Sequence, residues 1–148
     1  WGTTTAKYYS PTRSITDSPG SDYQNNTTRT IMYSNPIDLT DAETAKVTFY
    51  AQWEIEADYD YCQFQVSLDG GTSWIGQCGL YTNAGSAANN SVQPDNEPVW
   101  DGTQTTWVAE EISLSDYIGE TIRVRFILES DGGVRNDGFY FDEFKILK

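Results

Sequence analysis

The chain has 148 residues, a length that fits one domain with a core of its own. Its 22 acidic side chains outnumber 9 basic ones, for a net charge of −13, and it contains no histidine. Nucleic-acid binding depends on Lys and Arg that neutralise phosphates, so we expect no nucleic-acid partner. The lack of histidine excludes Ser-His-Asp and Cys-His catalysis and His-ligated zinc. No segment approaches the ~20 apolar residues of a membrane helix, so we expect no membrane insertion.

Short segments that alternate apolar and polar residues, separated by Gly, Pro and Asp turns, predict an all-β fold. The expected strands are residues 46–53, 61–68, 73–78, 104–113, 121–129 and 138–147, with a turn at 115–118. We expect a jelly-roll β-sandwich of two antiparallel sheets that forms one domain over residues 1–148. The polar segment 81–98 lacks periodicity and is expected to be functional or mobile.

The last expected strand, 138–147, carries a carboxylate among aromatic residues. With strict alternation, Asp142 lies on the same face as Tyr140 and Phe144. A buried, unpaired carboxylate is costly, so Asp142 needs either a cation or several hydrogen-bond donors. Because the chain has few bases, Ca²⁺ is the leading candidate. The alternative is an Asp at the rim of the strand that accepts backbone N–H groups.

A loop rich in oxygen donors, residues 16–26, provides further candidate ligands for this cation. Ca²⁺ takes six to eight oxygen ligands and tolerates irregular geometry. We expect a structural Ca²⁺ site near Asp17, Asp22 and Asp142, joined by Asn25 or Asn26. Such a metal would tie the N-terminal loop to the C-terminal strand. The alternative is that Asp17 begins an Asx turn and Asp22 is solvated.

Acidic residues recur at alternate positions between the strands expected at 46–53 and 61–68. They are Glu54, Glu56, Asp58 and Asp60. This row predicts a strongly negative rim of the sheet, which could hold a second cation or a sugar. A solvated strand end is the alternative. The sequence identifies no carboxylate pair with the perturbed acidity of a glycosidase.

Aromatic residues beside the irregular segment are candidates for sugar stacking. Tyr81 and Trp100, with Asp101 next to it, flank this segment, and flat rings on loops are a common platform for pyranose rings. The tryptophans inside patterned strands are instead expected in the core. These are Trp53, Trp74 and Trp107.

The two cysteines, Cys62 and Cys78, lie at equal distances from Gly70 in an expected hairpin. In that register they would face each other on the core side, close enough for a disulfide. An extracellular setting favours the bridge, and two adjacent thiols are the alternative.

Several runs in order along the chain resemble a known module. They are Tyr9-Ser-Pro, Ser14-Ile-Thr-Asp-Ser-Pro, Ile37-Asp-Leu-Thr, Trp53-Glu-Ile-Glu, Tyr59-Asp-Tyr, Ser67-Leu-Asp-Gly-Gly-Thr-Ser-Trp, Asp101-Gly, Trp107-Val and Gly138-Phe-Tyr-Phe-Asp-Glu-Phe. This series is similar to the MAM-like, or immune inhibitor A-like, jelly-roll domain that follows the catalytic unit of secreted zinc carboxypeptidases of the carboxypeptidase T type in Bacteroidetes.

The resemblance implies a secreted accessory domain, often Ca²⁺-bound and without peptidase chemistry, whose partner is its own catalytic domain in cis. It assigns the Ca²⁺-ligand role to Asp17 and Asp142. The family strand commonly ends Asp-Asp, whereas Asp142 is followed here by Glu143. Besides this accessory function, a carbohydrate-binding module for neutral glycans and a carboxylate-pair glycosidase remain as hypotheses. The acidic charge also allows a basic peptide segment as a partner.

Overall fold

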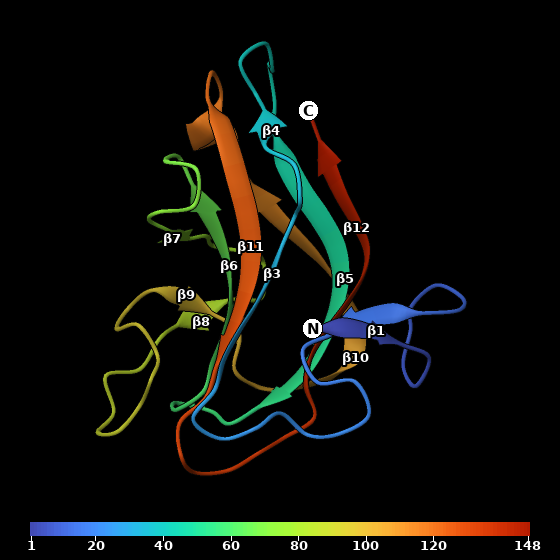
Figure 1. Cartoon of the computed structure of the whole chain (residues 1–148), viewed down its shortest axis with the longest axis vertical. Coiled ribbons are helices and arrows are strands. Elements are labelled where there is room, and N and C mark those ends of the chain that lie inside the picture. The colour runs from blue at the N-terminus through green and yellow to red at the C-terminus, as the bar shows by residue number, and fades with distance from the viewer.

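A computed structural model covers all 148 residues, Trp1–Lys148, and shows two antiparallel β-sheets that pack face to face (Figure 1). The first sheet, sheet A, has the order β1 (Gly2–Thr4), β2 (Ser14–Thr16), β12 (Gly138–Leu147), β5 (Lys46–Ile55), β10 (Gly102–Ser113). The second sheet, sheet B, has the order β3 (Thr28–Met32), β11 (Thr121–Glu129), β6 (Tyr61–Ser67), β7 (Ile75–Gly76), and β4 (Ile37–Asp38) also pairs with β11. A separate ribbon joins β8 (Asn83–Ala84) to β9 (Pro98–Val99).

The core lies between the two sheets and is built from the alternate residues of each strand. Along β5, the side chains of Val47, Phe49, Ala51 and Trp53 are buried in one cluster of 22 residues. Phe126 of β11 has aromatic neighbours from both sheets, including Phe49 at a ring-centroid distance of 5.3 Å. Burial of such large rings is the main source of stability in a sandwich of this kind.

The irregular segment 81–98 packs against the outer face of sheet B. The Nε2 atom of Gln93 donates to the carbonyl of Asp60 at 2.7 Å, and Val92 packs against a small apolar cluster that includes Tyr61 and Ile127. All seven residues of β6 are buried, and this segment covers the outer face at the start of the strand.

The expected all-β sandwich of two antiparallel sheets is confirmed, and β5, β6, β10, β11 and β12 occupy the predicted ranges within two residues. The jelly-roll designation stays a prediction. The turn expected at 115–118 is a short 3₁₀-helix, Ser115–Tyr117. The structure contains no helix that is long and apolar enough to cross a bilayer.

Candidate metal centre

Asp142 lies on the outer face of sheet A, not toward the core. Phe139 and Phe141 face inward, and a bulge between Asp142 and Lys145, with Glu143 at φ 54°, then reverses the alternation. The carboxylate of Asp142 accepts the backbone N–H groups of Tyr9 at 2.9 Å and Ser10 at 2.8 Å. Asp142 therefore shares its face with Tyr140 as alternation predicts, but the bulge separates it from Phe144, and Asp142 has the hydrogen-bond donors that the alternative interpretation required.

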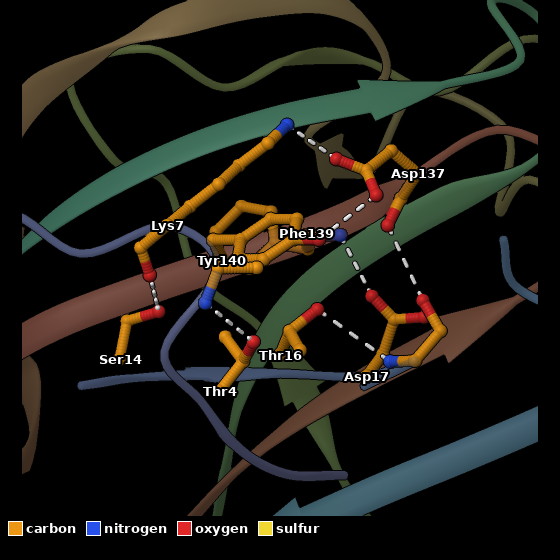
Figure 2. A network of polar contacts seen from close by, with 10 residues as sticks. Thr4, Lys7, Ser14, Thr16, Asp17, Asp137, Phe139 and Tyr140 are labelled. Atoms are coloured by element: carbon orange, nitrogen blue, oxygen red, sulfur yellow. Dashed lines mark hydrogen bonds and ion pairs between the residues drawn. The ribbon is translucent and has the colours of Figure 1, made fainter. Parts of the chain in front are cut away.

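Asp17 is fully buried beside the start of β12. Its Oδ1 accepts the N–H of Phe139 at 2.7 Å, whereas its Oδ2 has no hydrogen-bond partner (Figure 2). Burial raises the pKa of Asp17 to about 6. Gly138 is required here, because a Cβ at this position would lie 2.3 Å from Oδ1 of Asp17. No contact joins Asp17 to Asp142, so the structure does not bring these two expected ligands together.

The other residues of the expected site diverge as well. Asp22 is exposed. Asn25 turns toward the loop between β11 and β12, where its Nδ2 donates to the carbonyls of Gly132 at 3.0 Å and Gly133 at 2.8 Å. The Oδ1 atom of Asn25 is buried and accepts no hydrogen bond.

Three carboxylates meet at this same end of the sandwich, the lower end in Figure 1. Glu56 follows β5, Asp60 precedes β6, and Asp131 lies in the loop between β11 and β12. One oxygen from each lies within 4.8 Å of the others. We call Glu56, Asp60 and Asp131, with Asn25 beside them, the acidic cluster.

Asp60 is the most confined member of the acidic cluster. It is 0% exposed, its Oδ1 accepts the N–H of Asp131 at 2.7 Å, and its Oδ2 is buried without a partner. Burial raises the pKa of Asp60 and the nearby charges of Asp131 and Glu56 act in the same direction, whereas the N–H of Asp131 and the hydroxyl of Tyr23 lower it. A charged carboxylate buried beside two further acids is unfavourable unless a cation or a proton neutralises it.

No ion pair of the chain supplies that positive charge. The three ion pairs are Lys7–Asp137, Lys46–Glu111 and Lys145–Glu143, all outside the cluster. Three carboxylates and an amide oxygen form the all-oxygen donor set that Ca²⁺ prefers. The residues of the acidic cluster therefore fit a calcium ion better than Asp17, Asp22 and Asp142 do.

The remaining ligand candidates have structural contacts. Trp100 is 0% exposed, and its Nε1 donates to Glu110 at 3.0 Å, so the expectation of a sugar platform at Trp100 is wrong. Asp101 accepts hydrogen bonds from the side chains of Asn83 and Gln93 and from the N–H of Asp58, which is itself exposed.

Two other members of the expected rim are separated from each other in the structure. Glu54 is half-buried on β5, and Tyr81 is 47% exposed on the loop before β8. No contact joins them, so they do not form one site.

The two cysteines are free, with Cys62 buried and Cys78 exposed. The hairpin pairs Gln65 with Gly76 and Val66 with Ile75, which places Cys78 one residue out of register with Cys62. Cys62 pairs instead with Trp100. The expected disulfide is therefore not formed, because the register of the hairpin differs by one residue.

Comparison with known protein families identifies the family of this β-sandwich. The family model described as "Immune inhibitor A-like, MAM domain" matches residues 17–147. The chain belongs to the immune inhibitor A-like MAM family. This MAM domain is 30% identical over 106 residues to "Immune inhibitor A" from Bacillus thuringiensis, which covers 71% of this chain and 14% of that protein.

Two further relatives of the MAM domain are also much longer than it is. "Bacillopeptidase F" from Bacillus subtilis is 30% identical over 108 residues, 73% of this chain and 6% of that protein. "Pre-pro-metalloprotease PrtV" from Vibrio cholerae is 25% identical over 119 residues, 76% of this chain and 11% of that protein. The MAM domain thus spans a small part of each of these relatives.

Two members of the acidic cluster, Glu56 and Asp60, belong to the negative rim that the sequence predicts, whereas nothing in that prediction includes Asp131. The signal present was the turn Asp131-Gly132-Gly133, where an acid precedes two flexible residues. The proximity of this turn to Asp60 depends on strand pairing between β6 and β11, which brings Tyr61 opposite Glu129.

Proposed function

We propose that this MAM domain is a non-catalytic, calcium-stabilised accessory domain of a secreted bacterial peptidase. Membership of the immune inhibitor A-like MAM family supports this proposal, as do relatives whose names denote peptidases. Because the chain spans 6–14% of those relatives, the catalytic unit would lie elsewhere in the parent protein and act as the partner in cis. A zinc carboxypeptidase of the carboxypeptidase T type is the parent that we propose.

We propose that the domain itself is non-catalytic because of the side chains that it contains and lacks. With no histidine, the chain lacks the usual general base and the usual zinc ligand. The acidic cluster is held by hydrogen bonds to loop backbone, as in the pair between Asp60 and the N–H of Asp131. We therefore expect the isolated domain to hydrolyse no peptide substrate.

The calcium ion would be held by Glu56, Asp60 and Asp131, with Oδ1 of Asn25 as a fourth ligand. The observation that carries this assignment is the buried, unpartnered Oδ2 of Asp60 within a group of three carboxylates. A bound cation would neutralise this group and join three loops: the one before β3, the β5–β6 turn and the β11–β12 loop. The function of the metal in this proposal is structural.

Isothermal titration calorimetry of the metal-free domain tests the proposal. We expect Ca²⁺ to bind at one site, and Mg²⁺ to bind much more weakly, because Mg²⁺ requires a near-ideal octahedron of oxygens and retains its water. Replacing Glu56 by Gln should weaken Ca²⁺ binding, whereas replacing the exposed Asp22 by Asn should not. Absence of Ca²⁺ binding to the wild type would contradict the proposal.

A further inference from the structure

Three aromatic side chains gather on the outer face of sheet A. The ring of Tyr9 stacks on that of Tyr50, with a centroid distance of 3.5 Å and an interplanar angle of 11°. The ring of Trp107 meets Tyr9 edge-on at 6.4 Å. Tyr50 alternates along β5 with Phe49 and Ala51, which belong to the core, so it faces away from that core. We call Tyr9, Tyr50 and Trp107 the aromatic platform.

This arrangement differs from the expectation that Trp107 lies in the core. A bulge in β10 between Gln104 and Val108 interrupts the alternation, and Trp107 becomes half-buried on the solvent side. The solvated face of an antiparallel sheet is ordinarily polar. Aromatic rings that gather on such a face are therefore candidates for contact with a ligand.

The segment that carries Tyr9 is fixed to the sheet at several points. Asp142 accepts the N–H groups of Tyr9 and Ser10. Lys7 pairs with Asp137, and the hydroxyl of Ser14 donates to the carbonyl of Lys7 at 2.6 Å (Figure 2). Tyr9 nevertheless remains 46% exposed. Its ring is therefore held in place before any ligand arrives, which lowers the entropic cost of binding.

A hollow of about 310 Å³, lined by both apolar and charged side chains, adjoins the platform at Tyr50. Its walls include Glu111, Glu143 and Lys145, and the ammonium of Lys145 lies 2.8 Å from the carboxylate of Glu143. The hollow thus offers hydrogen-bond acceptors and a donor next to flat apolar rings. Sugar hydroxyls require both donors and acceptors, while the C–H face of a pyranose packs on an aromatic ring.

We propose that the aromatic platform and the adjoining hollow bind a pyranose unit of a neutral oligosaccharide. The net charge of −13 disfavours sulfated or uronic chains, so the proposed oligosaccharide carries no anionic groups. In this site Tyr9 and Trp107 contact the sugar, and Asp142 positions Tyr9. The inference goes beyond the calcium-stabilised accessory function and uses none of the residues of the acidic cluster.

Calorimetric titration of the calcium-loaded domain with cellohexaose, xylohexaose and mannohexaose tests this site. The wild type should bind at least one of the three. Tyr9→Ala and Trp107→Ala should each weaken that binding by tenfold or more, while Tyr9→Phe retains the ring and should stay within about threefold. The control is Tyr33→Ala, because Tyr33 is equally exposed at 46% and follows β3 in the other sheet. Thermal melts show whether each variant is folded.

Several outcomes would overturn the proposal. They are no binding of any of the three hexasaccharides by the wild type, equal weakening by Tyr33→Ala, or full retention of affinity in both Tyr9→Ala and Trp107→Ala. Binding that weakens more than tenfold between ~0.05 M and ~0.5 M salt would also overturn it, since it would indicate ion pairing. Oligosaccharide binding should persist in EDTA at a temperature where the metal-free domain is folded. Failure of the calcium proposal would therefore leave the oligosaccharide result unchanged, and the two proposals can be tested independently.

Discussion

Replacement of Asp60 by Asn tests the acidic cluster through two opposite effects on stability. Without metal, the wild type buries a carboxylate whose Oδ2 has no donor, beside Glu56 and Asp131. Asn has the same shape, its oxygen can still accept the N–H of Asp131, and its amide can donate to the neighbouring acids. We therefore expect metal-free Asp60→Asn to be more stable than the metal-free wild type, by about 1 kcal/mol or more.

With Ca²⁺ the order should reverse. A ligand that binds only the native state adds RT ln(1 + [L]/Kd), about 2.7 kcal/mol at a hundredfold excess over Kd. For a chain of 148 residues this corresponds to a rise in Tm of about 5–11 °C. The Asn variant loses one charged ligand, so its gain at the same Ca²⁺ concentration should be below about 1 kcal/mol.

Thermal unfolding followed by circular dichroism, in EDTA and in Ca²⁺, measures both effects. Asp58→Asn is the matched control, because Asp58 lies in the same turn, is exposed and does not belong to the cluster. Its left-handed backbone, at φ 68°, also suits Asn. The reasoning is refuted if Asp60→Asn shows the same Ca²⁺-dependent rise as the wild type and Asp58→Asn.

Two further predictions concern buried carboxyls outside the cluster. Glu110 is 2% exposed and accepts the N–H groups of Leu80 and Tyr81 and the Nε1–H of Trp100, so Glu110→Gln should destabilise the domain by about 1–3 kcal/mol in urea unfolding. An unchanged midpoint would contradict this role. Burial raises the pKa of Asp17 to about 6 in the folded state, above the value of about 3.9 in an unfolded chain. Protonation of Asp17 therefore stabilises the folded state, and this stabilisation is lost as pH rises through 6. Asp17→Asn, measured in EDTA, should therefore gain stability relative to the wild type between pH 4 and pH 7, and a constant difference over that range would count against it.

Much of the fold could be predicted from the sequence, because alternation of apolar residues and turn signals are local. The strands β5, β6, β11 and β12 were expected close to their observed bounds. The faces of single residues were harder to predict where alternation is interrupted. The bulge in β12 turns Phe144 toward the core, whereas Asp142, which precedes the bulge, shares the outer face with Tyr140. The bulge in β10 includes the outward-facing Trp107, and neither bulge has a signature such as glycine or proline at that position.

The residues of the candidate metal centre could not be predicted from local sequence patterns. Asn25, Asp60 and Asp131 are far apart in the sequence and meet only through the pairing of β3, β6 and β11. Trp100 is likewise buried because it pairs with Cys62, which lies far from it in the sequence. No local sequence pattern indicates that pairing. The sequence indicated an oxygen-rich cation site, and the pairing of strands determines which oxygens lie together.

A crystal structure of the domain grown with Ca²⁺, with anomalous differences measured at a wavelength where calcium scatters, would locate the metal itself. We expect a peak bounded by Oδ2 of Asp60 and the carboxylates of Glu56 and Asp131, with metal–oxygen distances of about 2.3–2.6 Å. Oδ1 of Asn25 should complete the protein ligands. A Ca²⁺-soaked crystal with no anomalous peak in this cluster, or with its peak beside Asp142 instead, would contradict the account.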